Sequence, residues 1–189
     1  MTVRLKRFTA CFFVVVVMLT IVGCTSPDLR PNRNPVGEKF PRVVGEALNG
    51  PEVILPDDLA GKPAVLLVGY VQNAQFDADR WLLGLLQSRI SVAIREVPVI
   101  EGLMIRLLAG VIDGGMRKGI PSDDWASVIT VYGGADQIVE VTGNSNPRNI
   151  RVLLLDSAGK ICWFHDQGYS ARVLLELKAK VDELNKNTQ

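Results

Sequence analysis

The segment 64–70, which reads Ala-Val-Leu-Leu-Val-Gly-Tyr, constrains the fold of this chain most strongly. It contains no charged side chain and no alternation of polar and apolar residues. A strand with one face in water alternates, whereas a strand covered on both faces is apolar throughout. We therefore expect this segment to lie in the middle of a sheet that helices cover on both sides, as in α/β proteins.

Predicted strands and helices alternate around this run. A hairpin precedes it, because the stretches 42–47 and 52–55 flank Asn49-Gly50, a strong turn signal. Further elements follow: a helix at 77–88, a strand at 92–97, a helix at 100–113, a strand at 127–132, a hairpin at 152–164 and a helix at 171–184. Between them, the polar stretch 133–149 reads as a loop with a short strand at 138–141. This order predicts a mixed sheet flanked by helices.

The helix at 100–113 has the clearest pattern, since its apolar residues recur at helical spacing. They are Ile100, Leu103, Met104, Leu107, Leu108, Val111 and Ile112. We expect this stripe to face the core rather than to form a partner-binding groove. Gly114-Gly115 is expected to end the helix.

The first residues predict export. Arg4, Lys6 and Arg7 precede an apolar run of about 14 residues, shorter than the roughly 20 that a spanning helix needs. The run ends in Ile21-Val22-Gly23-Cys24, which resembles the bacterial lipobox. That resemblance implies a diacylglycerol on Cys24 and cleavage before it, so that lipid holds the protein to a membrane. An ordinary signal peptide with a chance cysteine is the alternative.

Three regions follow from this interpretation: a signal peptide at 1–23, a lipidated and flexible tether at 24–38, and a domain at 39–189. Thr25 follows Cys24, where lipoproteins retained in the inner membrane often have aspartate. We therefore expect a cell-envelope protein, in the outer rather than the inner membrane if the host is Gram-negative.

Composition limits the classes of ligand that this chain can bind. The net charge is only +1, and three of the basic residues lie in the predicted signal, so we expect no nucleic-acid partner. His165 is the single histidine, which leaves no histidine-rich metal site. Asp57-Asp58 and Asp123-Asp124 lack the loop pattern of an EF-hand, and we read them as turns or helix starts. No metal and no cofactor are expected.

The element order resembles the thioredoxin-like fold, in the variety with an extra N-terminal hairpin that peroxiredoxins and thiol-disulfide lipoproteins have. The opening hairpin (40–56), Gly61-Lys62-Pro63 before the apolar strand, and the late hairpin (155–161) carry this resemblance over residues 38 to 185. The chain also resembles the mitochondrial ATP-synthase assembly factor family, at 119–121 and 156–163. That family's thioredoxin-like fold lacks the redox motif, and the resemblance implies an assembly or chaperone role.

In a redox-active thioredoxin-like fold, the nucleophilic cysteine follows the first central strand and opens the next helix. Here the segment 72–77 reads Gln-Asn-Ala-Gln-Phe-Asp and contains no cysteine, serine or threonine. The proline that this family often has directly before the late strand is absent as well, since Ile150-Arg151 precede Val152. We therefore expect no catalytic residue and no enzymatic activity.

Cys162 offers the alternative, a thiol-dependent oxidoreductase with relocated chemistry. We read it as a buried cysteine within a strand, because residues three apart on a regular strand, such as Cys162 and His165, point to opposite faces. The leading hypothesis is a non-catalytic, lipid-anchored envelope protein that binds or assembles other envelope proteins. A ligand carrier would need a roomy apolar pocket.

Overall fold

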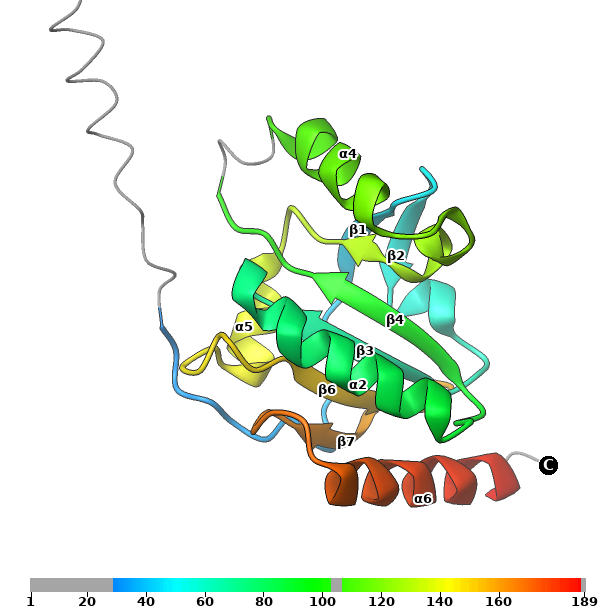
Figure 1. The fold of residues 1–189 in the computed structure, drawn as a ribbon. Coiled ribbons are helices and arrows are strands. Elements are labelled where there is room, and N and C mark those ends of the chain that lie inside the picture. The colour runs from blue at the N-terminus through cyan, green and yellow to red at the C-terminus, as the bar shows by residue number, and fades with distance from the viewer. Residues whose placement is uncertain (1–28, 103–106, 188–189) are drawn as a thin grey trace, which may run out of the picture.

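A four-stranded mixed sheet forms the centre of the domain. The computed structural model describes residues 29–102 and 107–187, and within them the sheet has the order β4-β3-β6-β7 (Figure 1). Its strands are β3 (Ala64–Gly69), β4 (Ala93–Pro98), β6 (Arg151–Leu155) and β7 (Ile161–His165). β4 is parallel to β3, whereas β6 is antiparallel to β3 and β7 antiparallel to β6. The predicted mixed sheet is confirmed.

The N-terminal hairpin belongs to a second, smaller sheet in the order β2-β1-β5. Its strands are β1 (Val43–Ala47), β2 (Glu52–Leu55) and β5 (Ile129–Thr130). β1 and β2 pair antiparallel from Val43–Leu55 to Glu46–Glu52, which confirms the predicted hairpin. Parallel bridges from Glu96 to Val128 and from Val99 to Val131 connect this sheet to the edge of β4.

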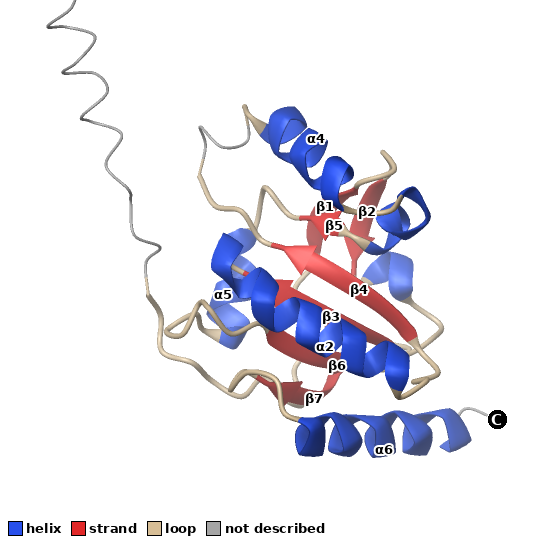
Figure 2. Ribbon diagram, viewed as in Figure 1, coloured by secondary structure: helices blue, strands red, loops and turns tan. Residues whose placement is uncertain are grey.

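Helices cover both faces of the main sheet, as Figure 2 shows. α2 (Gln75–Gln87) and α6 (Ala171–Asn187) cover one face, and α5 (Ala135–Thr142) covers the other. α4 (Ala109–Gly119) lies next to β1 and β5 of the smaller sheet (Figure 2). Short 3-10 helices lie at Asp57–Leu59, Gln72–Ala74 and Ser122–Ser127. Within the described residues, no helix has the length and apolar character needed to cross a membrane.

Alternate residues of β3 enter two hydrophobic cores. Val65 and Leu67 lie in the cluster beneath α2 and α6, where Trp81 and Leu177 are fully buried. Leu66 and Val68 lie in the opposite cluster, with Ile138 of α5 and side chains of the N-terminal hairpin. The strand is therefore covered on both faces, as its continuous apolar sequence predicts.

The expected helix at 100–113 is wrong in its position and in its environment. The backbone of Ile100 still follows the sheet, because its N–H donates to the carbonyl of Val131, and α4 begins only at Ala109. α4 continues through Gly114 and Gly115 to Gly119. Leu107, Leu108 and Val111 are exposed rather than core-facing, while Leu103 and Met104 lie outside the described residues. Periodicity shows which side chains share a face but not what that face contacts.

The expected loop and short strand within 133–149 are also wrong, because α5 occupies Ala135–Thr142. Its buried residues, Ala135, Ile138, Val139 and Thr142, follow the spacing i, i+3, i+4, i+7, which is helical. Gly134 precedes it with φ +79, a left-handed conformation that glycine adopts without strain. The polar and glycine residues around this spacing favoured the loop interpretation.

Candidate functional site

The segment 72–77 follows the central strand and opens the next helix, as expected. Gln72–Ala74 form a 3-10 turn that leads directly into α2. Phe76 points its side chain into solvent, and the amide of Gln75 donates to Asp79 at 2.8 Å. The structure thus confirms the place of this segment in the fold.

Asp77 ties this segment to two distant parts of the chain. Its buried carboxylate accepts one hydrogen bond from the N–H of Ile150 at 3.0 Å and another from the N–H of Tyr169 at 2.8 Å. The first contact fixes the entrance to β6, and the second fixes the loop before α6. Both oxygens are therefore used in holding the backbone.

Arg151 lies next to this edge, fully buried at the start of β6. Three backbone carbonyls surround its guanidinium: Gly143 O at 3.1 Å, Asn146 O at 2.7 Å and Asn149 O at 2.7 Å. Burial lowers the pKa of Arg151, while Tyr70 and Asp166 act in the opposite direction. An arginine side chain stays protonated in proteins, so the site contains a buried cation.

Tyr70 and Thr142 complete this buried polar cluster. The hydroxyl groups of Tyr70 and Thr142 are 2.6 Å apart, and the guanidinium of Arg151 lies 5.4 Å from the centre of the Tyr70 ring. Burial raises the pKa of Tyr70 to about 12, so its hydroxyl is neutral at physiological pH. The sequence reasoning missed this cluster, although an arginine at the head of an apolar strand was a signal for it.

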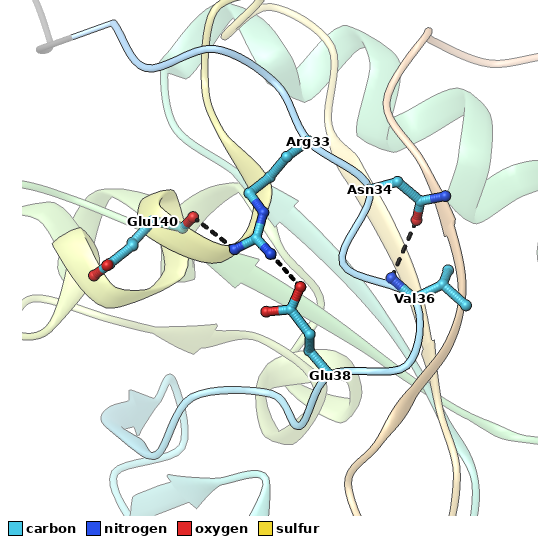
Figure 3. Close-up of polar contacts among 5 residues, drawn as sticks. All are labelled: Arg33, Asn34, Val36, Glu38 and Glu140. Carbon is cyan, nitrogen blue, oxygen red and sulfur yellow. Dashed lines mark hydrogen bonds and ion pairs between the residues drawn. The ribbon is translucent and has the colours of Figure 1, made fainter.

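The chain at 29–38, which we call the strap, lies along the domain (Figure 1, blue). The sequence predicts a flexible tether here, yet Asn32 places its side-chain amide between Arg151 and Asp166. Arg33 donates to the carbonyl of Glu140 and forms an ion pair with Glu38, as Figure 3 shows. The asparagines and arginines that made the segment look flexible are the groups that bind it.

Cys162 and His165 are placed differently from the expectation. A register shift between Leu154 and Leu155 bulges the β6–β7 pair, so that Cys162 and Trp163 both contact the cluster beneath α2 and α6. The His165 ring faces the same cluster, 5.7 Å from the ring of Trp81. The opposite faces expected for a regular strand do not apply here, because the bulge intervenes.

These two side chains nevertheless have separate partners. The Cys162 thiol donates to the carbonyl of Leu154 at 3.2 Å, and His165 Nε2 is 2.9 Å from the carbonyl of Gly168. Burial, with Asp156 as a lesser cause, raises the pKa of Cys162 to about 11. The thiol is therefore protonated at neutral pH, which disfavours it as a nucleophile.

Of the two aspartate pairs singled out in the sequence, Asp57-Asp58 has side-chain partners and Asp123-Asp124 lies in a helix start. Asp57 forms an ion pair with Arg42, and Asp58 accepts the N–H of Ile54. Asp123 and Asp124 lie in the first turn of a 3-10 helix. Across residues 29–102 and 107–187, no group of three or more acidic, histidine or cysteine side chains could hold a metal ion.

An open cavity of about 280 Å³ lies where β3 and β4 begin, lined by residues 58–64 with Ala93 and Arg95. This is the opposite end of the strands from the segment 72–77. Its volume is slightly below the roughly 300–1,000 Å³ of usual small-molecule sites.

Several solved structures are similar to this chain. They include a putative protein disulfide isomerase from Bacteroides thetaiotaomicron (17% identity, 80% of this chain and 90% of that one, TM-score 0.51). Copper-bound yeast Sco1 matches at 15% identity, over 79% and 94% of the two chains, with TM-score 0.51. The thioredoxin domain of a thiol-disulfide oxidoreductase from Bacteroides vulgatus matches at 14%, over 77% and 97%, with TM-score 0.50.

The chain therefore has a thioredoxin-like fold, as the order of its elements predicts. At these identities the likeness shows the fold alone. No protein-family model matches the sequence, and no curated protein matches it.

The same structures correct the expectation that the chain is not an enzyme. Two of them are described as a putative protein disulfide isomerase and a thiol-disulfide oxidoreductase, so proteins described as enzymes share this fold and the expectation is not upheld. The segment 72–77 lacks a cysteine, but a cysteine there is only one chemistry at one place on the fold. That absence does not exclude a reactive group elsewhere on the fold.

Proposed function

We propose that this protein is a lipid-anchored lipoprotein of the cell envelope whose thioredoxin-like domain binds other envelope proteins. The lipobox-like sequence that ends in Cys24 supports the anchor, and Cys24 itself lies outside the described residues. Placement in the outer membrane stays a prediction, as does the assembly role that the resemblance to the ATP-synthase assembly factor family implies.

The proposed binding role rests on the outer face of α2, where apolar side chains are exposed. Phe76 is 71% exposed, Leu83 57% and Leu86 61%. Phe76 and Leu83 are seven residues apart, so they lie one above the other, two helical turns apart. The opposite face of the helix carries Trp81 and Leu85, which are fully buried.

Exposed apolar side chains on one helix face, with the exposed Asp79 and Arg80 between Phe76 and Leu83, suit a protein partner that is apolar with a polar rim. Neighbouring exposed apolar side chains on a folded domain commonly mark a binding surface, and aromatic residues are frequent anchors of such surfaces. Phe76 also belongs to the turn that opens α2 at the edge of the central sheet. The expected partner is an envelope protein with a complementary apolar helix or groove.

Site-specific photo-cross-linking in cells of the source organism tests this proposal. A photoreactive residue at Leu83 should yield a discrete cross-linked protein, and Phe76→Ser should reduce its yield at least ten-fold. Leu175 is a matched control position, because it is an apolar side chain, 63% exposed, on a different helix. If Leu83 and Leu175 give the same products, or neither gives a discrete one, the α2 surface does not bind a partner.

A further inference from the structure

We infer that the strap occupies a peptide-binding site, and that this site binds an extended segment of a partner protein when the strap leaves it. We call the site the strap dock; it consists of Thr142, Gly143, Asn144, Ser145, Arg151 and Asp166. The partner's nature rests on the protein-binding function proposed above, whereas the site itself is argued from the contacts of the strap.

The strap dock holds the main chain of the strap. The side-chain oxygen of Asn144 accepts the N–H of Arg30 at 2.7 Å, and the N–H of Asn144 donates to the carbonyl of Arg30 at 3.0 Å. The N–H of Arg33 donates to the carbonyl of Thr142 at 3.4 Å. These contacts involve only backbone atoms of the strap, so any extended peptide can make them.

One side chain of the strap is recognised specifically. The side-chain oxygen of Asn32 accepts hydrogen bonds from Ser145 N at 2.9 Å, from Ser145 Oγ at 2.8 Å and from Arg151 Nη2 at 2.8 Å. Its amide nitrogen donates to Asp166 Oδ2 at 2.6 Å. A carboxylate in its place would face Asp166 with like charge, and an apolar side chain would leave both Arg151 and Asp166 without this partner. The strap dock therefore selects a side-chain amide.

The strap dock keeps its shape independently of the strap. The three carbonyls around Arg151 come from the loop 143–149 itself, so the guanidinium organises the loop whether Asn32 is present or not.

The bound strap approaches the dock most closely at Gly143. Gly143 has φ +68, and a Cβ there would overlap the carbonyl oxygen of Pro31. The approach of the two backbones is thus close enough to require glycine.

The first half of the strap, residues 30–34, is held more weakly than the dock, whereas its second half is anchored by the buried Pro35 and by main-chain hydrogen bonds between residues 37–38 and Ile161. Arg30, Pro31, Arg33 and Asn34 are exposed, whereas Asn144 and Arg151 are buried. The Arg33–Glu38 ion pair lies within the strap (Figure 3), and its side chains are 45% and 42% exposed, so it adds little to docking. Segments with few buried apolar contacts open locally far more readily than the core. A partner peptide must compete with the strap. Because the strap is tethered to the same domain, its effective concentration at the strap dock is in the millimolar range.

Fluorescence anisotropy with a labelled peptide of the strap sequence, residues 29–38, tests the inference on the purified full chain in detergent. We expect Asn32→Ala, which removes the side-chain contacts of the bound strap, to bind this peptide at least ten-fold more tightly than the wild type does. A peptide with alanine at the position of Asn32 should bind this variant at least ten-fold more weakly than the native peptide does.

Glycine variants then test whether the peptide binds at the strap dock. Adding Gly143→Ala to Asn32→Ala should abolish peptide binding. Adding Gly61→Ala should not, because Gly61 also has a positive φ (+92) but its Cβ would meet nothing within 4 Å. Thermal melting checks the fold of each variant. Ser145→Ala, at an exposed position, serves as a milder dock variant with an expected three- to five-fold loss.

Two results would overturn the strap dock: Asn32→Ala shows no gain in peptide binding, or the alanine peptide binds as tightly as the native one. Equal loss with Gly61→Ala and Gly143→Ala would also contradict it. The measurement uses neither membranes nor the α2 surface, so its failure is distinguishable from failure of the proposed function.

Discussion

Asp77 and Arg151 are the two buried charged side chains next to the turn that opens α2, and both bind backbone rather than an opposite charge. Asp77 accepts two N–H groups, and Arg151 donates to three carbonyls. Charged groups make stronger hydrogen bonds than neutral ones, so each fixes loop backbone that would otherwise lack partners. Hydrogen bonds between these two side chains and backbone groups therefore hold the loops at this end of the sheet in place.

Asp77→Asn tests the role of that carboxylate. An amide presents one oxygen and one NH₂ group, so either Ile150 N–H or Tyr169 N–H would face a donor. We expect the free energy of unfolding to fall by about 1–3 kcal/mol, measured by urea denaturation. Asp79→Asn is the control, because Asp79 is exposed. Equal stability of the two variants would contradict the assigned role.

Cys162 provides a pH-dependent prediction. Its pKa is raised to about 11 by burial, so the thiolate fraction at pH 8 is about 100-fold smaller than for a thiol with a pKa of 9. Alkylation by iodoacetamide should therefore be slow at pH 8 and should increase about ten-fold per pH unit up to about pH 11. Peptide mass spectrometry reports Cys162 specifically.

The urea-unfolded protein is the reference for this measurement, since its thiol is solvated. A rate in the folded protein that levels off below pH 9 would show that Cys162 is an activated thiol. That result would make Cys162 the first candidate for a catalytic residue.

At the scale of elements, α2 and α6 cover one face of the sheet and contact each other at Gly84. A Cβ at Gly84 would lie 2.9 Å from the ring of Tyr169 and 3.0 Å from Leu174 Cδ2. The two helices therefore approach at a position where only glycine fits. This close approach explains why a helix with otherwise good helix formers carries a glycine in its interior.

Gly84→Ala should consequently destabilise the domain by about 1–3 kcal/mol, because overpacking outweighs the gain in helix propensity. Gly114→Ala is the matched control. Gly114 also lies inside a helix, but its Cβ would meet nothing within 4 Å, so a gain of about 0.5–1 kcal/mol is expected. Thermal melts of both variants show whether each substitution lowers or raises the stability. A stabilised Gly84→Ala variant would refute the close contact.

For the whole molecule, the strap would set how far the domain reaches from the lipid proposed on Cys24. With the strap docked from Arg30 onward, at most about 18 Å of chain separates Cys24 from Leu29, since an extended residue spans at most about 3.6 Å. With residues 30–34 released from the strap dock, the free linker extends to the buried Pro35, and the reach becomes about 36–40 Å. Docking would hold the domain close to the membrane, and release would let it reach a partner.

Lipid on Cys24 is the premise of this geometry, and radioactive palmitate tests it. We expect the wild type to be labelled and to sediment with membranes, and Cys24→Ser to lose both properties, because a thioether needs the cysteine sulfur. Cys11→Ser is the control, since Cys11 lies in the predicted signal and should not affect labelling. An unlabelled wild type would show that the chain carries an ordinary signal peptide.

The sequence by itself determined the central strand, the two hairpins and the order that makes the fold thioredoxin-like. These follow from local rules: the apolar run of β3 needs cover on both faces, and Asn49-Gly50 favours a tight turn. The place of the segment 72–77 at the start of α2 followed from the same order.

Only the tertiary structure decided what each pattern contacts. The stripe on α4 is exposed, α5 is a helix, and the strap is bound, because side-chain environment depends on residues far away in the sequence. Asn32 and Arg151 are 119 positions apart, and no local rule pairs them. A bulge, likewise a product of strand pairing, placed Cys162 and His165 on one face. Local energetics fix elements, whereas long-range packing fixes sites.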